Sequence, residues 1–216
     1  MYASQEHSSY DGETGTAQKI VTRIASEHIA RTAYELARLT NRRLVTIVHK
    51  GNVLPQTDGL FRRVAFEVSE QYKDIETDEL LVDTAAYWMV KEPTRFDIIL
   101  TMNQYGDILS DMAAAWGGGL GFVPALNLGD TIGIAEPVHG SAPDIAGKKM
   151  ANPTATILSA ALLVRYHWKM PDIAQRIETA VRNTLDNGIH TSDVQISGAV
   201  TTQDFTDLIC EQLAHD

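Results

Sequence analysis

The sequence predicts an α/β fold, because segments typical of strands and of helices alternate along the chain. Three runs rich in β-branched and aliphatic residues, at 44–48, 75–82 and 96–101, are expected to form strands. Apolar residues at helical spacing follow them, for example between Leu60 and Val68. Such alternation is characteristic of α/β proteins, and no internal repeat or low-complexity tract interrupts it.

A glycine-rich segment divides the predicted fold into two domains. Gly117 to Gly121 follow the third strand and its helix, and they are expected to break the chain there. We therefore expect one domain over 1–119 and a second over 120–216. The 216 residues are enough for one large or two small domains with a real core.

The remaining elements of the first half follow from local signals. Residues 3–19 are polar and carry Asp11–Gly12, which predicts a hairpin or a loop. Residues 20–24 are expected to form a strand, and Ser26 is expected to cap the helix after it.

In the second half, a strand is expected at 132–135 and a loop rich in Gly, Pro and Ser at 137–149. Asn152 is expected to cap a helix that runs to about Tyr166. Two further helices are predicted, one at about 172–185 and one capped by Thr201 or Thr202.

Composition excludes several classes of protein. The 44% hydrophobic content is that of a globular chain, and the net charge of −10 argues against a nucleic-acid partner. The single cysteine, Cys210, excludes a disulfide framework within the chain and is expected to be a small buried apolar residue. No apolar run is long enough for a transmembrane helix, so no membrane partner is expected.

Two aspartates suggest a metal site after the third strand. Gly106 is expected to form a tight turn, and the residues after it a helix. Asp107 and Asp111 are four apart, so their carboxylates would share one helix face. Oxygen-only ligands suit Mg²⁺ or Mn²⁺ rather than zinc. The alternative is that both acids merely complement the helix dipole.

Other polar residues stand where strands meet loops, at Lys50 with Asn52 and at Asp83. Ligands of open α/β sheets collect at such strand ends. A lysine and several carboxylates there would form a site for metal-assisted chemistry on an anionic small molecule. Each residue has a simpler reading, because Lys50 could be a solvated loop lysine and Asp83 a helix cap.

Four long motifs together resemble one family, the β-decarboxylating hydroxyacid dehydrogenases, which include isopropylmalate, isocitrate, homoisocitrate and tartrate dehydrogenases. The motifs occupy residues 45–52, 81–86, 103–111 and 136–154. The resemblance implies an isopropylmalate dehydrogenase-like two-domain fold. Residues 1–119 would form the domain that binds substrate and metal and makes the dimer contact, and residues 120–216 the C-terminal part of the nucleotide-binding domain. It implies no Rossmann fold, and the chain has no Gly-x-Gly-x-x-Gly after a strand.

The resemblance also implies roles for individual residues. Asp107 and Asp111 resemble the family's metal ligands, and Asp83 resembles a third acid contributed by the partner subunit. Lys50 resembles the lysine that acts as, or relays to, the base on the substrate hydroxyl, also across the dimer. Asn52 resembles a substrate-binding amide. Tyr2 stands where the family has the tyrosine that protonates the enol carbon.

The resemblance places the nucleotide at the loop over residues 139–147. The residues expected to bind the cofactor are Glu136, His139, Gly140, Ser141, Ala142, Pro143, Asp144, Ile145 and Asn152. Asp144 would accept hydrogen bonds from the adenosine ribose, and Asn152 would meet the adenine. A carboxylate roughly 4 Å from a 2′-phosphate repels each unit charge by about 4 kcal/mol at an effective dielectric near 20, which favours NAD over NADP. His139 and His49 are expected to be structural neighbours rather than catalytic bases.

The function implied is NAD-dependent oxidative decarboxylation of a 3-carboxy-2-hydroxy acid, with 3-isopropylmalate as the first candidate. Isocitrate, homoisocitrate and tartrate are alternative substrates, and a non-catalytic fragment or regulatory subunit is the alternative class. The family pattern has a long segment before the position of Tyr2, so an N-terminally truncated chain with little activity by itself is expected. A homodimer with shared active sites is implied, in the cytoplasm or, in a eukaryote, in mitochondria.

Overall fold

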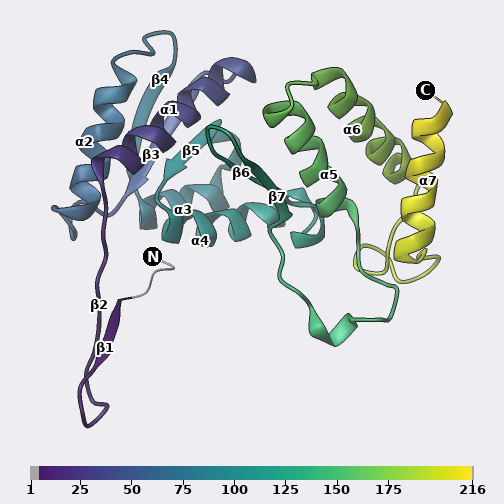
Figure 1. Cartoon of the computed structure of the whole chain (residues 1–216), viewed down its shortest axis with the longest axis horizontal. Coiled ribbons are helices and arrows are strands. Elements are labelled where there is room, and N and C mark those ends of the chain that lie inside the picture. The colour runs from purple at the N-terminus through teal and green to yellow at the C-terminus, as the bar shows by residue number, and fades with distance from the viewer. Residues whose placement is uncertain (1–4, 216) are drawn as a thin grey trace. The chain divides into compact units, whose positions relative to one another are not determined.

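The computed structural model describes residues 5–215 and separates into two compact units, Met1–Met112 and Ala113–Asp216 (Figure 1). The first unit contains a parallel sheet with helices, and the second contains a short antiparallel sheet with helices. The expected α/β class is confirmed in both units.

The first unit is built on three parallel strands. β3 (Leu44–His49) lies between β4 (Glu76–Leu81) and β5 (Ile98–Thr101), with Val45 opposite both Thr77 and Ile98. β3 is buried from its second residue onward, which explains why its sequence is a continuous apolar run instead of an alternating one. The three expected strands are confirmed.

Helices pack against this sheet. α1 (Arg23–Leu39) and α2 (Thr57–Ser69) contribute to one core cluster with β3 and β5. Tyr34 stacks on Tyr72 with ring centroids 5.0 Å apart inside that cluster. α3 (Val82–Lys91) follows β4, and α4 (Asn103–Ala114) follows β5, so each begins at the carboxyl end of a strand.

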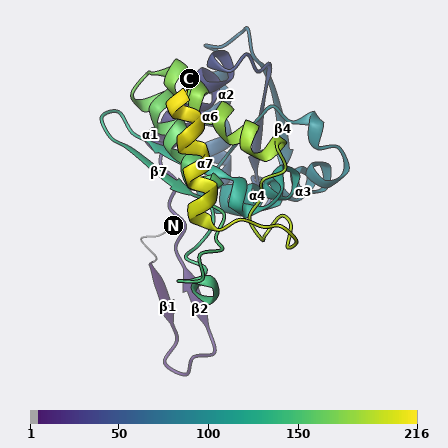
Figure 2. The same cartoon turned by 90° about the vertical axis from the view of Figure 1, so that its right-hand side faces the viewer.

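The N-terminal segment forms the expected hairpin. β1 (Glu6–Ser8) pairs with β2 (Gly15–Ala17), and the turn between them holds Gly12 at a φ of +75°. Every residue of both strands is exposed, and the hairpin extends away from the helices of its own unit in Figures 1 and 2.

Two local predictions around the start of α1 are wrong. Residues 20–24 form no strand, because α1 begins at Arg23. Thr22 rather than Ser26 caps the helix, since its hydroxyl accepts the Ala25 N–H at 3.3 Å. Ser26 is buried inside the first turn and donates its hydroxyl to the Thr22 carbonyl at 2.8 Å.

Gly106 does not form the expected turn. α4 already begins at Asn103, and the Gly106 N–H donates to the Met102 carbonyl at 2.9 Å as part of the helix. An added Cβ on Gly106 would lie 3.7 Å from the Thr101 side chain, an ordinary contact distance. Asp107 and Asp111 therefore lie within an established helix.

In the second unit, β6 (Pro124–Leu128) and β7 (Gly133–Pro137) form an antiparallel pair. The sequence predicted only β7. α5 (Thr154–Leu162) packs on both strands and continues into a π-helical turn, Leu163–His167. The Ser159 hydroxyl joins helix to sheet, because it donates to the Glu136 carbonyl at 2.9 Å and accepts the Ala125 N–H at 3.3 Å.

Two more helices complete this unit, α6 (Pro171–Asp186) and α7 (Thr202–His215). Phe205 and Ile209 of α7 are buried against Val181 of α6. Thr201 caps α7 as expected, since its hydroxyl accepts the Asp204 N–H at 3.1 Å. Cys210 is exposed, so its expected burial is wrong.

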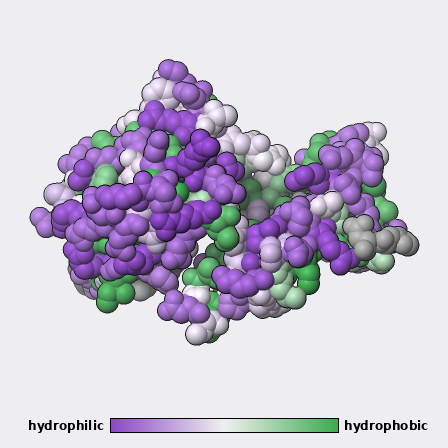
Figure 3. Space-filling view, turned by 90° about the horizontal axis from the view of Figure 1, so that it is seen from above, coloured by the Kyte–Doolittle hydropathy of each residue, from purple (hydrophilic) through white to green (hydrophobic). Residues whose placement is uncertain are grey.

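Short 3₁₀ turns occur at Pro93–Arg95, Ala115–Gly117, Leu120–Phe122 and Pro143–Ile145. Over residues 5–215, every helix is too short or too polar to cross a bilayer. Figure 3 shows hydrophilic residues over most of the face that it presents, with apolar residues in small groups.

Candidate functional site

The predicted polar residues of the first unit gather at one edge of its sheet. Lys50 follows β3, Asp83 lies in the first turn of α3 after β4, and α4 follows β5. Because the three strands are parallel, their carboxyl ends share one edge, and the order β4-β3-β5 places Lys50 in the middle.

Lys50 and Asp83 are in direct contact. The Lys50 Nζ donates to the Asp83 Oδ1 at 2.5 Å, and this contact is the first cause that lowers the pKa of the Asp83 carboxyl below its usual range. The Lys50 side chain is half-buried and the Asp83 side chain exposed. The Lys50 carbonyl accepts the N–H groups of Val53 and Leu54, which closes a turn that carries exposed Asn52.

Asp107 and Asp111 are both exposed, and their spacing places them on one face of α4. The Asn103 amide nitrogen donates to the Asp107 Oδ2 at 3.1 Å, which orients this carboxylate. Among residues 5–215, no three His, Cys, Asp or Glu side chains come together as a metal site. A cation held by this pair would therefore need oxygen ligands from outside the described part of the chain. Tyr2 lies outside the described residues.

His49, next to Lys50, is a buried structural residue. Its Nδ1 accepts the Gly51 N–H at 3.0 Å, so the ring proton is on Nε2, which donates to the Glu79 carboxylate at 3.2 Å. Arg62 binds the same carboxylate through both of its oxygens and is the main cause that lowers the pKa of Glu79.

One buried carboxylate was not recognised from the sequence. Asp58, in the first turn of α2, has a fully buried side chain that accepts hydrogen bonds from Lys19 Nζ at 2.6 Å and Tyr105 Oη at 2.9 Å. Its Oδ2 also accepts the Lys50 N–H at 2.8 Å.

The ionisation of this cluster follows from its contacts. Burial raises the pKa of Asp58, but the Lys19 ammonium, the Lys50 N–H and the Tyr105 hydroxyl together outweigh burial and lower it. Burial and the neighbouring Asp58 carboxylate raise the pKa of Tyr105 to about 12. Asp58 is thus an anion at neutral pH and Tyr105 a neutral donor.

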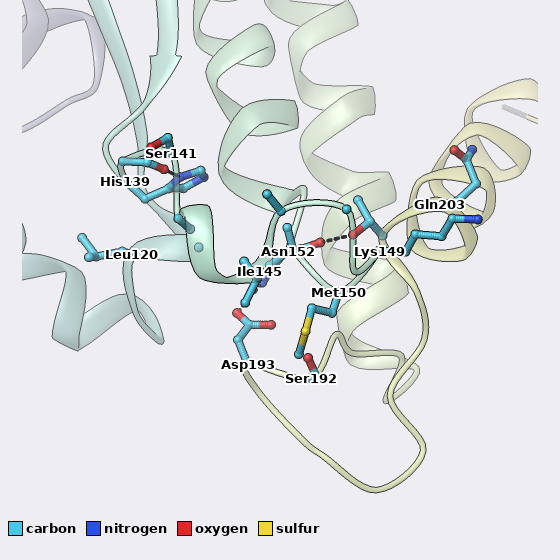
Figure 4. Close-up of a pocket in the computed structure, with 17 residues that line it drawn as sticks. Leu120, His139, Ser141, Ile145, Lys149, Met150, Asn152, Ser192, Asp193 and Gln203 are labelled. Atoms are coloured by element: carbon cyan, nitrogen blue, oxygen red, sulfur yellow. Dashed lines mark hydrogen bonds between the residues drawn. The ribbon is translucent and has the colours of Figure 1, made fainter.

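The second unit contains a cavity of about 930 Å³ (Figure 4). His139 and Ser141 reach it from the segment after β7, and Ser192 and Asp193 reach it from the loop before α7. Six of the predicted cofactor-binding residues line the cavity: His139, Gly140, Ser141, Ala142, Ile145 and Asn152.

Three predicted cofactor-binding residues are not part of the lining. Glu136 lies on β7, where the Asn127 amide nitrogen donates to its Oε1 at 2.7 Å across the strand pair. Pro143 and Asp144 belong to the 3₁₀ turn beside the cavity, with exposed side chains. The His139 Nδ1 is 2.9 Å from the Gly140 carbonyl, which fits the structural role expected for this ring.

Asn152 is held in one orientation. Its Oδ1 accepts the Thr154 N–H at 3.0 Å, and its Nδ2 donates to the Asp193 Oδ2 at 3.0 Å. The Thr191 hydroxyl donates to the other oxygen of Asp193 at 2.5 Å. A Cβ on Gly121 would come within 3.0 Å of the Asp193 carboxylate, so Gly121 leaves room for this pair. The Asn152 Nδ2 carries a second proton that the bond to Asp193 does not use.

Asp193 was missed because nothing in its local sequence distinguishes it from a loop aspartate, and it is 41 residues from Asn152. The glycines at 117–121 were interpreted only as a break, although Gly121 borders the cavity.

Comparison with known proteins gives consistent results. A family model described as isocitrate/isopropylmalate dehydrogenase matches residues 1–209. The 3-isopropylmalate dehydrogenase of Archaeoglobus fulgidus is 44% identical, over 94% of this chain and 61% of the relative. The isocitrate/homoisocitrate dehydrogenase of Thermus thermophilus is 44% identical, over 99% of this chain and 62% of the relative. The alpha subunit of the mitochondrial NAD isocitrate dehydrogenase of Bos taurus is 44% identical, over 98% of this chain and 57% of the relative.

A solved structure agrees with these relatives. The isocitrate dehydrogenase of Methylococcus capsulatus has a TM-score of 0.93 and 42% identity, over 98% of this chain and 63% of that one. The expected fold class is confirmed, and the chain spans about three fifths of the length of the proteins that it matches.

Proposed function

Because the chain belongs to the isocitrate/isopropylmalate dehydrogenase family, we propose that it carries part of an active site for NAD-dependent oxidative decarboxylation of a 3-carboxy-2-hydroxy acid. The observation that carries the proposal is the contact of Lys50 with Asp83 at the sheet edge from which α4 also starts. We propose 3-isopropylmalate as the first substrate to test. Isocitrate and homoisocitrate are equal alternatives, since relatives named for these substrates are 44–45% identical.

The reaction requires a group that takes the hydroxyl proton and an acceptor for the hydride on the same carbon. In its neutral form, the Lys50 Nζ would receive the hydroxyl proton, and Asp83, 2.5 Å away, would stabilise the ammonium that forms. The bond to the 3-carboxylate then breaks, CO₂ leaves, and the remaining enolate carbon takes a proton, which we assign to Tyr2. Asn52 would bind the substrate beside Lys50.

Asp107 and Asp111 fit a hard divalent cation, Mg²⁺ or Mn²⁺, because they offer exposed carboxylate oxygens from one helix face. Such a cation would polarise the ketone that forms. The pair supplies only part of an octahedral oxygen shell, and we propose that Asp83 of a second copy completes the protein ligands. The Asp83 Oδ2 is the oxygen that does not contact Lys50 in the same chain. This arrangement makes a homodimer with shared sites part of the proposal.

The cavity of the second unit is the proposed adenosine site. Asn152 has one N–H left for an acceptor on the base, and Asp144 in the adjacent turn would accept from the ribose hydroxyls. Asp193 adds a second carboxylate at the cavity. Two carboxylates disfavour a 2′-phosphate, which supports NAD over NADP. A regulatory subunit without catalysis is the weaker proposal, because Lys50, Asp83, Asp107 and Asp111 are all present.

The decisive experiment measures NADH formation from each of the three substrates with Mg²⁺ or Mn²⁺. The chain of 216 residues is expected to show little turnover by itself and to gain it when mixed with the N-terminal third of a relative. NADP should replace NAD poorly. The proposal fails if the mixture binds NAD but oxidises none of the substrates. Fast turnover by the chain alone would contradict only the expectation about the fragment.

A further inference from the structure

Asp58 is the most enclosed carboxylate at the proposed catalytic edge, and the mechanism above does not use it. Its side chain has no exposed surface, and four hydrogen bonds reach its two oxygens. The donors are Lys19 and Thr57 at Oδ1, and Lys50 and Tyr105 at Oδ2. A buried charge is costly unless it is paired and hydrogen-bonded, and here both conditions are met.

These donors come from separate parts of the chain. Lys19 follows the β1–β2 hairpin, Lys50 follows β3, and Tyr105 belongs to α4. The Lys50 N–H and the Tyr105 hydroxyl meet at one atom, Oδ2, at 2.8 and 2.9 Å. The backbone that carries Lys50 and the helix that carries Asp107 are thus joined through a single oxygen.

This oxygen completes the restraint on Lys50. The Lys50 carbonyl already accepts two N–H groups from its own turn, and Asp58 holds the N–H on the other side. Loops after strands are ordinarily mobile. Because hydrogen bonds hold both its N–H and its carbonyl, the Lys50 backbone is fixed in the position from which the side chain contacts Asp83.

Two simpler roles explain less. An acid in the first turn of a helix complements the helix dipole, but such an acid is usually exposed, whereas Asp58 is fully buried. An ion pair with Lys19 could serve stability alone, but buried ion pairs are weak evidence for stability. Neither role accounts for the Lys50 N–H and Tyr105 sharing Oδ2.

We propose that Asp58 is a positioning residue, which fixes the backbone of Lys50 against α4 by binding the Lys50 N–H and the Tyr105 hydroxyl together. The proposal rests on the proposed function for the role of Lys50. Its physical content, that Asp58 controls the geometry of Lys50, can be tested without turnover.

Asp97, the residue before β5, supplies a matched control at the opposite end of β3. Its Oδ2 accepts the N–H groups of Arg43 and Leu44 at 2.9 and 3.2 Å, and its Oδ1 pairs with Arg42. It therefore does at the start of β3 what Asp58 does at the end. Asp58→Asn and Asp97→Asn remove the same charge from opposite ends of one strand.

The test records amide hydrogen exchange and the side-chain ammonium resonances of lysine by NMR on the whole chain, with Lys50→Met to assign the Lys50 signal. Asp58→Asn should raise the exchange rate of the Lys50 amide about tenfold, the effect of one lost charge-assisted hydrogen bond, and leave Leu44 within about twofold. It should also move the Lys50 ammonium signal toward that of exposed Lys73. Asp97→Asn should do the reverse, with Leu44 affected and Lys50 unchanged.

Tyr105→Phe removes one donor and keeps the ion pair with Lys19, so it provides a second variant if Asp58→Asn does not fold. It should raise the exchange rate of the Lys50 amide by about threefold, because Oδ2 loses one restraint. Equal changes at Lys50 in the Asp58 and Asp97 variants, or none in the Asp58 and Tyr105 variants, would overturn the proposal. If Lys50→Met kept full turnover in the complemented enzyme, the proposed role of Lys50 in the reaction would be wrong. The restraint of the Lys50 backbone by Asp58 would not be affected by that result.

Discussion

Gly133 allows close packing between β7 and the π-helical turn after α5, two elements whose neighbouring segments line the candidate nucleotide cavity. It lies on β7, which leads to His139, and it faces the π-helical turn after α5, the helix that starts beyond Asn152. A Cβ on Gly133 would lie 2.8 Å from the Leu163 Cδ1 and 2.9 Å from the His167 Cγ. Carbon atoms pack best at roughly 3.5–4.0 Å, so Gly133→Ala inserts a methyl group into space that is already filled.

Gly133→Ala should destabilise the second unit. Overpacking typically costs about 1–3 kcal/mol, whereas replacing an unstrained glycine by alanine stabilises by only about 0.4–1 kcal/mol, so the clash dominates. We expect a loss of about 1–2 kcal/mol, measured by urea unfolding and by amide exchange in α5.

Gly15→Ala is the control, because Gly15 is also a strand glycine and an added Cβ there has no neighbour within 4 Å. It should be neutral or slightly stabilising. If Gly133→Ala proves as stable as Gly15→Ala, the close approach of β7 to the π-helical turn is not a feature of the folded protein.

Two further predictions concern the polar clusters. Asp58→Asn should lower the free energy of unfolding by about 3 kcal/mol near pH 7, since it leaves a lysine without its buried partner. Folding lowers the pKa of Asp58, so the ionised carboxylate contributes to the free energy of unfolding above about pH 4, and this contribution is lost as the pH falls further. The difference in free energy of unfolding between wild type and Asp58→Asn should therefore become smaller below about pH 4. Asp193→Ala should free the Asn152 amide and weaken binding of ADP-ribose about two- to tenfold by calorimetry, the effect of one hydrogen bond. An unchanged affinity would mean that the orientation of Asn152 does not matter for binding.

The parallel sheet was predictable because its strands are marked locally. β3 is buried on both faces, and this burial requires the uninterrupted apolar run that identified it. The same holds for the shared face of Asp107 and Asp111, which follows from helix geometry once a helix is recognised. β6 escaped detection because it opens with Pro124, a residue that argues against a strand.

Features that depend on long-range contacts could not be predicted from the sequence. Asp58 resembles any acid in a first helical turn, and its partners Lys19 and Tyr105 are 39 and 47 residues away. The cap of α1 was misplaced because Thr22 and Ser26 are both good capping residues, and burial of Ser26 decides between them.

The proposed role of Lys50, beside Asp83, is to take the substrate proton in a family dehydrogenase site. Its most direct test is the rate of NADH formation by the complemented enzyme with Lys50→Met, against Lys73→Met, which removes an exposed lysine paired with Glu70. A positioned general base contributes about 10²- to 10⁴-fold, so Lys50→Met should lose at least about a hundredfold in kcat with NAD affinity unchanged, while Lys73→Met keeps full activity. Equal activity of the two variants would contradict the role of Lys50.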